Sequence, residues 1–233
     1  MSESERRSAA GAAPGPAGRG DGDPSGGRPG PGGARTTDRR LLRGERARRT
    51  IARHAVDVAS REGLNGLSIG RLATDLGLSK SGVATLFGTK ERLQLAAVAS
   101  AREAFLDAVV RPASAAPAGA ARLRALTECW ITYAEAPLFA GGCFWVANLA
   151  DFDSRPGPVR DALSGQHRDW LALLAGELRH AAGSGEIAPL DADLAAFQLD
   201  AVLTAANIAL RLGEADVVDT VRRVTDGLLA PRR

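Results

Sequence analysis

Apolar residues recur at helical spacing in this chain, in segments that are separated by glycine- and proline-rich breaks. Ile51, Ala55 and Val58, for example, stand three or four positions apart and would share one face of a helix. No segment shows the regular alternation of apolar and polar residues that predicts a half-buried strand. The pattern therefore predicts an all-α protein.

The breaks delimit the expected helices, and local signals mark several of their ends. Ser68, Ser79 and Thr89 stand where a side chain can cap a helix amino terminus. Gly77 can take the left-handed conformation that ends a helix sharply, and Pro112 is expected to end another. The expected helices cover residues 44–61, 69–76, 80–87, 90–110, 120–135, 142–152, 157–182, 191–212 and 214–229.

Charge and composition divide the chain along its length. Residues 1–38 are rich in Gly, Pro, Ala and Arg and lack large apolar side chains other than the initial Met, so we expect a disordered tail. Residues 41–111 carry a net charge of +5, whereas residues 112–233 carry −4. A basic front half suits a polyanionic partner, and an acidic back half does not.

The segment around the only two lysines of the chain, Lys80 and Lys90, has the pattern of a helix-turn-helix. Two short helices flank a tight Gly-Leu-Ser turn, and the second would bury Val83 and Phe87 on one side. Its other side offers small or cationic residues, which suits a helix that enters a DNA major groove. A helical hairpin that only packs a core is the alternative. Seven arginines between Arg39 and Arg53 favour DNA binding.

Residues 46–95 resemble the amino-terminal domain of the TetR family of bacterial transcription regulators. The resemblance rests on order and spacing over about fifty residues, at Ile51, Ala55, Gly63, Leu72, Ala73, Gly77, Ser79, Phe87, Lys90, Glu91 and Leu93. The later part of the chain looks like the regulatory domain of one subgroup of this family. The resemblance implies a helix-turn-helix DNA-binding domain in residues 39–95 and a helical effector-binding and dimerisation domain in residues 96–233.

The same resemblance assigns roles to individual residues. Lys90 would clamp a DNA phosphate, and residues of the second short helix would approach bases or phosphates. The family usually has an aromatic residue at the position of Ala84 and often a histidine at that of Leu86, so we expect the arginines to compensate. The candidate DNA-binding residues are Arg46, Arg48, Arg49, Thr50, Ser68, Ser79, Lys80, Ser81, Ala84, Thr85 and Lys90.

Most aromatic side chains of a chain that is only 4% aromatic lie between Trp130 and Trp170. An apolar cavity with a few polar groups is what a small-molecule site requires. Core packing is the alternative for each single residue. The candidate ligand-binding residues are Trp130, Tyr133, Cys143, Phe144, Trp145, Asn148, His167 and Trp170.

The last two expected helices suit a dimer interface. Residues 191–212 are apolar nearly all round, and Val217, Val221, Val224 and Leu228 form a stripe on the final helix. Two such helices from each copy could pair about a two-fold axis, although an intramolecular core would also use them. We favour the homodimer, because a protein that reads palindromic double-stranded DNA needs two copies. The family implies a repressor that an unknown small-molecule effector releases from its operator.

Other functions have weaker support in the sequence. The chain lacks the His-Glu-x-x-His, P-loop and Cys-x-x-Cys motifs, and its histidines are scattered, so we expect no catalytic residues, metal or cofactor. A helical ligand-binding dimer with weak or lost DNA binding is one alternative, motivated by Ala84 and Leu86. A thiol-based sensor at Cys143 is another. Without a run of 18 apolar residues or a secretory signal, we expect a cytoplasmic protein without a membrane partner.

Overall fold

The computed structural model describes residues 32–231, with side chains from residue 42 onward. The chain divides into two units, residues 1–39 and 40–233, and the packing that positions the functional sites lies within the second. Of the tail predicted to be disordered, residues 1–38, residues 1–31 fall outside the described residues, whereas residues 32–38 belong to a helix. All secondary-structure elements in the described part of the chain are helices, which confirms the all-α prediction.

The amino-terminal helices are α1 (Gly32–Glu62), the short η1 (Leu64–Gly66), α2 (Ile69–Asp75) and α3 (Lys80–Phe87). The expectation that the first helix starts at residue 44 was wrong, because α1 begins at Gly32. No proline stands between residue 32 and Gly44, and a single interior glycine costs only about 1 kcal/mol. A helix can therefore continue through this arginine- and leucine-containing stretch.

Side-chain caps set the boundaries of the short helices, as the sequence predicted. The hydroxyl oxygens of Ser68, Ser79 and Thr89 each accept a hydrogen bond of 3.1 Å from a backbone N–H three residues later. Such a cap is worth about 1 kcal/mol. Gly77 turns the chain between α2 and α3 with a φ of 63°, a left-handed conformation that favours glycine.

Helix α4 (Lys90–Phe105) continues into a π-helical segment, η2 (Leu106–Val110), and then into one further turn, α5 (Arg111–Ala113). The helical path runs through Pro112 and ends at Ala113, within the break that was expected at Pro112 and the Ser-Ala-Ala-Pro-Ala-Gly-Ala stretch.

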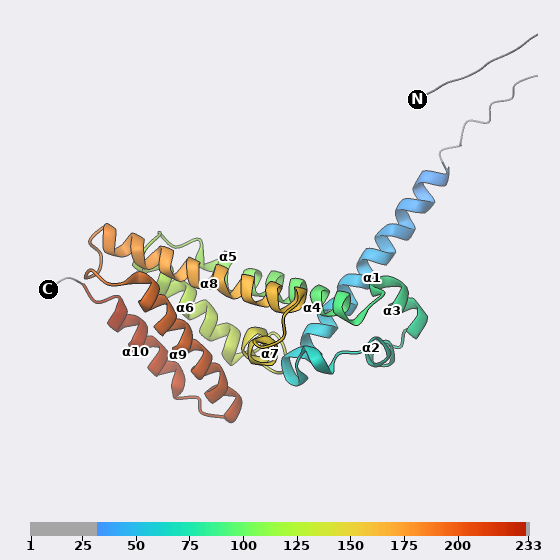
Figure 1. The fold of residues 1–233 in the computed structure, drawn as a ribbon. Coiled ribbons are helices and arrows are strands. Elements are labelled where there is room, and N and C mark those ends of the chain that lie inside the picture. The colour runs from blue at the N-terminus through green and yellow to red at the C-terminus, as the bar shows by residue number, and fades with distance from the viewer. Residues whose placement is uncertain (1–31, 232–233) are drawn as a thin grey trace, which may run out of the picture. The chain divides into compact units, whose positions relative to one another are not determined.

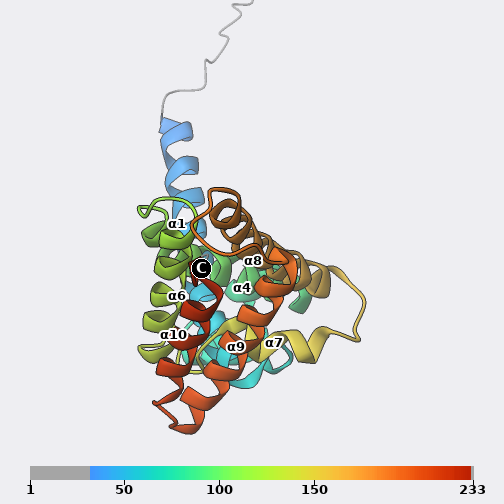
Figure 2. The same ribbon diagram turned by 90° about the vertical axis from the view of Figure 1, so that its left-hand side faces the viewer.

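The remaining helices form the carboxyl-terminal part of the molecule (Figures 1 and 2). Helix α8 packs along α9, α9 along α10, and α6 contacts α8, α9 and α10. Their bounds agree with the sequence expectations to within three residues. These helices are α6 (Ala120–Glu135), α7 (Phe144–Phe152), α8 (Pro158–Gly183), α9 (Ala192–Leu212) and α10 (Val217–Leu228).

Two hydrophobic clusters make up the core, and α7 contributes to both. The amino-terminal cluster contains the predicted stripe of α1, together with Val83 and Phe87 of α3. It also takes in Phe144 and Phe152 of α7. The carboxyl-terminal cluster is built by η2, α6, α8, α9 and α10, and the Trp145 side chain packs against both clusters. Helix α7 therefore joins the helix-turn-helix region to the larger helical region.

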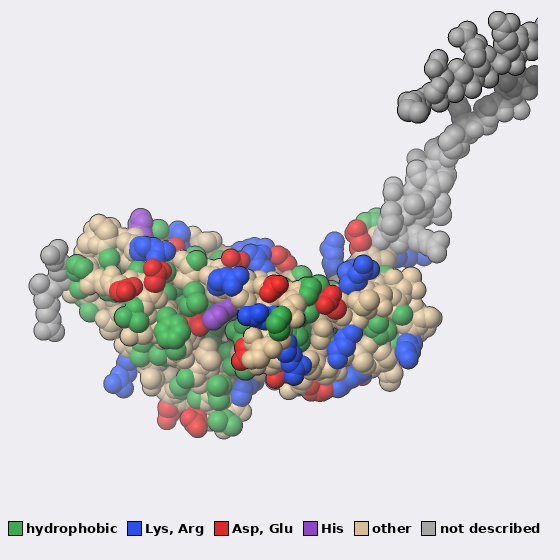
Figure 3. Space-filling model, viewed as in Figure 1, with side chains coloured by type: hydrophobic (Ala, Val, Ile, Leu, Met, Phe, Trp, Pro, Cys, Tyr) green, Lys and Arg blue, Asp and Glu red, His purple; other side chains and the backbone are tan. Residues whose placement is uncertain are grey.

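The last two helices use their apolar residues differently. Of the predicted stripe on α10, Val221 is buried within the protomer, and Val217 and Leu228 are partly buried against the same core. The neighbouring Val218 and Leu229 are also buried. Helix α9 instead leaves large apolar side chains in contact with solvent (Figure 3). The exposed fractions are 53% for Leu194, 63% for Phe197, 50% for Ile208 and 74% for Leu212.

Among the described residues, α9 is also the one helix that is long and apolar enough to cross a membrane, judged by length and composition only. The same composition is common in core helices of water-soluble proteins.

Candidate functional site

The outer side of α3 presents small or cationic groups. Lys80, Ser81 and Thr85 are exposed, and Ala84 is half-buried between them. We call these four residues the recognition face. The Thr85 hydroxyl donates to the Ser81 carbonyl at 2.8 Å, so its lone pairs remain free to accept a further hydrogen bond. Apart from the flexible Lys80, the side chains of this face are small, so a groove of another molecule can approach the helix closely.

Arg48 does not extend freely from α1, although the sequence suggested that it would reach DNA. Its guanidinium donates to the Leu86 carbonyl at 2.7 Å and lies 4.9 Å from the centre of the Phe87 ring. These contacts tie α1 to the carboxyl end of α3, where unpaired carbonyls favour a cation. Arg48 therefore positions α3, and the sequence offered no signal of this contact 38 residues away.

Lys90 also has an intramolecular partner. Its ammonium group donates to the Asn65 carbonyl at 2.6 Å and so ties the start of α4 to η1. The side chain is exposed, and an ammonium has two further protons to donate. Thr50 bonds to the Arg46 carbonyl, while Ser68 and Ser79 act as caps. These four candidates thus hold local structure, whatever else they contact.

Exposed basic side chains of α1 include Arg43, Arg46, Arg49 and Arg53, and of these Arg46 and Arg49 are candidate DNA-binding residues. Arg49 lies 3.8 Å from Glu45 on the surface, a contact that contributes little energy in water. Neither Arg46 nor Lys80 has an ion-pair partner among the described residues. In Figure 3, Lys and Arg side chains are spread over the end of the molecule that holds α2 and α3. This surface is suited to an anionic partner.

One ion pair and one hydrogen bond brace α1 against α2. Arg71 pairs with Glu62 through two nitrogens, and His54 lies 3.1 Å from Asp75. The hydrogen bond from His54 holds the pKa of Asp75 below its ordinary value. These contacts fix the orientation of the helix that precedes the recognition face.

Residues 66–70 read Gly-Leu-Ser-Ile-Gly and so fit the Gly-x-Ser-x-Gly pattern of serine hydrolases. That motif requires a sharp turn from a strand into a helix. Here η1 precedes the serine, and the Ser68 hydroxyl oxygen accepts from Arg71 N as a cap. The geometry does not support a nucleophile at this position.

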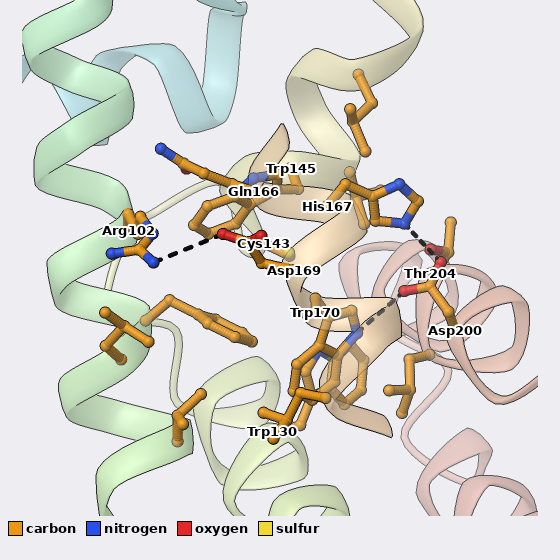
Figure 4. A pocket seen from close by; sticks show the side chains of 17 residues that line it. Arg102, Trp130, Cys143, Trp145, Gln166, His167, Asp169, Trp170, Asp200 and Thr204 are labelled. Atoms are coloured by element: carbon orange, nitrogen blue, oxygen red, sulfur yellow. Dashed lines mark hydrogen bonds and ion pairs between the residues drawn. The ribbon is translucent and has the colours of Figure 1, made fainter. Parts of the chain in front are cut away.

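An aromatic cavity of about 110 Å³ lies among the helices of the carboxyl-terminal part (Figure 4). Five of the candidate ligand-binding residues line it: Trp130, Cys143, Trp145, His167 and Trp170. Phe105 packs edge-to-face against Trp145 and Trp170, with ring centroids 5.3 Å apart in both pairs. We call this space the aromatic cavity. The sequence signal for it was the local concentration of aromatic residues.

Several lining residues were not predicted from the sequence, because they lie on helices far from the aromatic cluster. Arg102 and Phe105 come from α4, Leu106 and Val110 from the π-helical segment, and Asp200 from α9. Only the fold brings these residues against α7 and α8.

Three of the candidates do not line the cavity. Phe144 is fully buried in the amino-terminal cluster, and the Tyr133 ring packs behind Phe105 at a centroid distance of 5.5 Å. Asn148 of α7 is fully buried and does not line the cavity. Its oxygen accepts from Leu64 N at 2.6 Å, and its amide donates to the carbonyls of Ala59 and Phe144. These bonds tie α7 to the end of α1.

The charged groups in the wall of the aromatic cavity are already paired (Figure 4). Arg102 lies 3.6 Å from Asp169, and His167 lies 2.8 Å from Asp200. Asp200 also accepts from the Trp170 indole at 3.1 Å. The hydrogen bond between Asp200 and His167 raises the pKa of His167. The protonated histidine and the carboxylate then form an ion pair that has no net charge.

A second, open cavity of about 400 Å³ adjoins the first and shares Leu149 and His167 with it. Arg160, Ser164 and Arg168 of α8 line this outer space.

The geometry does not favour thiol or metal chemistry. Burial raises the pKa of the Cys143 thiol, and burial also raises that of Cys129, so both favour the unreactive protonated form. Within residues 42–231, no group of His, Cys, Asp and Glu side chains is arranged to hold a metal ion.

Comparisons with known proteins agree with this architecture. Residues 119–225 match the family described as tetracyclin repressor-like, C-terminal domain. No curated protein sequence matches the chain. Among solved structures, a TetR transcriptional regulator from Chloroflexus aurantiacus is 23% identical with a TM-score of 0.73, covering 79% of this chain and 94% of that one.

Two further structures extend the comparison. A TetR-family regulator from Streptomyces coelicolor is 21% identical with a TM-score of 0.68, covering 80% of this chain and 94% of its own. AibR, solved with isovaleryl coenzyme A and operator DNA, is 18% identical with a TM-score of 0.65, covering 79% and 99%. At these identities the likeness shows a shared fold.

Proposed function

The chain belongs to the TetR family of transcriptional regulators, and from this premise we propose that it is a cytoplasmic repressor that binds operator DNA as a homodimer. A small molecule in the aromatic cavity would release it. The helix-turn-helix of residues 39–95 would read the DNA, and the helical region of residues 96–233 would bind the effector and form the dimer. The observation that carries the proposal is the recognition face, bare of bulky side chains and flanked by exposed arginines.

The DNA contact follows from the shape and charge of this region. Lys80, Ser81 and Thr85 would approach base edges or phosphates from α3, and Arg46 and Arg49 would reach neighbouring phosphates. Phosphate contacts supply much of the affinity of such proteins. The arginines can therefore offset the absence of an aromatic side chain at Ala84.

The effector response would run through α4. This helix begins at Lys90, which is tied to η1, and ends at Phe105 in the wall of the aromatic cavity. A ligand that prefers one position of Phe105 would shift the population of α4 positions and with it the helix-turn-helix. AibR, which shares the fold, was solved with a coenzyme A thioester and operator DNA, which supports an effector of some kind in this architecture.

The dimer would form through the exposed apolar face of α9, defined by Leu194, Phe197, Ile208 and Leu212. Exposed patches of this kind mark interaction surfaces. A two-fold pairing of α9 would set the recognition faces about one turn of DNA apart, roughly 34–36 Å. Helix α10 would then support α9 from within the protomer.

DNA binding can be tested by fluorescence anisotropy with the duplex that lies upstream of the gene for this chain. The wild-type protein should bind at physiological salt, with log Kd depending linearly on log salt concentration. The variant Arg46→Ala/Lys80→Ala should bind more weakly, and its slope should fall by about 0.9 for each DNA phosphate that the protein no longer neutralises.

Arg179→Ala is the matched control, because Arg179 is an exposed arginine of α8 that pairs with Asp193. Its slope should equal that of the wild type. An unchanged slope in the double variant would contradict the assignment of Arg46 and Lys80. Absence of wild-type binding even at low salt would favour the alternative, a ligand-binding dimer that has lost DNA binding.

A further inference from the structure

Two residues that line the aromatic cavity each carry a buried polar atom that lacks a partner. Trp145 Nε1 and Gln166 Oε1 are buried, and neither has a hydrogen-bond partner among the described residues. Both residues line the cavity, Trp145 from α7 and Gln166 from α8. A buried donor or acceptor without a hydrogen bond lowers the stability of the fold, so the presence of these two atoms requires an explanation.

The two atoms are of opposite type. The indole nitrogen of Trp145 can only donate a hydrogen bond, whereas the amide oxygen of Gln166 can only accept one. A hydroxyl group does both, since it carries one proton and two lone pairs. A single hydroxyl on a ligand could therefore satisfy both atoms.

The rest of the lining restricts the body of that ligand. Phe105, Trp130 and Trp170 supply aromatic surface, and Leu106 and Leu173 supply aliphatic surface. The volume of about 110 Å³ is of the order of a single-ring compound, since a cavity of about 150 Å³ holds benzene. The apolar lining favours a ring over a polar chain.

The charges of the cavity wall argue against an ionic ligand. His167 already faces Asp200, and Arg102 lies 3.6 Å from Asp169, so an anion or a cation would have to compete with an existing partner. The Trp170 indole N–H is likewise engaged by Asp200. Trp145 and Gln166 are thus the buried polar groups without a partner that can orient a ligand, and the Thr204 hydroxyl is a further polar group of the lining.

We propose that the aromatic cavity binds an uncharged, single-ring phenol or a similar hydroxylated ring, whose hydroxyl accepts from Trp145 Nε1 and donates to Gln166 Oε1. This inference names the effector class and rests on the proposed regulatory function. It makes Trp145 and Gln166 the specificity-determining residues of the site.

The experiment is calorimetric titration of the full-length protein, without DNA, with four single-ring probes. The probes are p-cresol, its methyl isostere p-xylene, the anion 4-methylbenzoate and the cation benzyltrimethylammonium. The wild type should bind p-cresol more tightly than either ion. In Trp145→Phe and in Gln166→Leu, the affinity for p-cresol relative to p-xylene should fall about tenfold, as expected for one hydrogen bond removed.

Leu173→Ala is the matched control. It removes apolar surface from the lining of the same cavity and changes no polar group. Affinities for both neutral probes should change together in this variant, so that their ratio stays constant. Thermal unfolding of each variant checks that it folds. Because Trp145→Phe and Gln166→Leu test the two unpartnered atoms separately, the inference can still be tested if one variant does not fold.

Several outcomes would overturn the inference. One is an equal p-cresol to p-xylene ratio in the wild type and both variants, which would mean that water satisfies the two atoms. Another is tightest binding of the cation, which would indicate recognition by aromatic faces. Failure of all four probes to bind would also overturn it. Because these titrations contain no DNA, a phenol that binds yet leaves a DNA complex intact would count against the regulatory proposal only.

Discussion

Asn148 illustrates what a single buried side chain does in this molecule. Its amide spans from α7 to the backbone of Ala59 and Leu64, at the junction where α1 ends. The same helix contributes Trp145, Val146 and Leu149 to the lining of the aromatic cavity. Helix α7 thus contacts both the candidate ligand site and the helix-turn-helix region.

Replacing Asn148 with alanine should lower the free energy of unfolding by about 2–4 kcal/mol, because the Leu64 N–H would have no partner in a buried setting. Urea denaturation measures this change. Thr74→Ala is the control, since Thr74 is exposed on α2 and its replacement should change stability by about 0.5 kcal/mol or less. Equal effects of the two substitutions would contradict the role assigned to Asn148.

His167 should make stability depend on pH. Its folded pKa is raised by Asp200, so the pair stabilises the protein fully below the ordinary pKa of 6.5. This stabilisation disappears as pH rises through the folded value. The melting temperature of the wild type should therefore exceed that of His167→Gln by more at low pH than at high pH. Each kcal/mol of lost stabilisation lowers the melting temperature by about 2–4 °C.

Differential scanning calorimetry at about pH 5.5 and about pH 9 brackets the titration. His180→Gln provides the control, because His180 is exposed at the end of the same helix. A stabilisation that grows with pH would show that His167 is not held protonated by Asp200.

At the scale of elements, hydrogen bonds from its backbone amides hold the loop between α6 and α7 against α1. The Ala140 and Gly141 amides donate to Asp57 and to the Ser60 hydroxyl, at 2.9 and 3.0 Å. A Cβ atom added at Gly141 would lie 2.0 Å from the Ser60 carbonyl oxygen, closer than atoms can approach. Glycine at this position lets the loop reach the carboxyl end of α1.

Gly141→Ala should therefore force the loop from α1 and destabilise the protein by about 1–3 kcal/mol or more. Chemical denaturation measures this destabilisation. Gly44→Ala is the matched control, because a Cβ at Gly44 meets nothing within 4 Å and the residue lies inside α1. The control should be stabilised by about 0.5–1 kcal/mol through its higher helix propensity. Tolerance of alanine at Gly141 would refute the close approach.

At the scale of the whole molecule, the apolar face of α9 is exposed to water, which is unfavourable unless another surface buries it. The alanines and leucines of α9 that face inward are buried against neighbouring helices, but Phe197 and Leu212 remain exposed. Burial of such side chains is worth about 1.5–3 kcal/mol each. Pairing of two copies through this face would supply the burial.

Phe197→Glu should convert a dimer into a monomer, because two carboxylates would be buried near the two-fold axis. Light scattering coupled to gel filtration gives the mass directly. Thr132→Glu places the same charge on an exposed position of α6 and should leave the dimer intact. A wild-type protein that is monomeric at micromolar concentration would contradict this interface.

The sequence alone determined the helices and most of their ends. Periodicity of 3.6 residues, capping hydroxyls and turn glycines act over a few residues, so Ser68, Ser79, Thr89 and Gly77 could be assigned without coordinates. The aromatic concentration between Trp130 and Trp170 also pointed to the part of the chain that lines the cavity.

Tertiary structure alone decided which partner each side chain meets. Asn148 bonds to Leu64, 84 residues away, and Arg48 bonds to Leu86. A helix that is apolar nearly all round does not reveal which face stays exposed, so only packing distinguished α9 from α10. Such contacts depend on how helices are placed in space. The periodicity that predicts each helix carries no information about its neighbours.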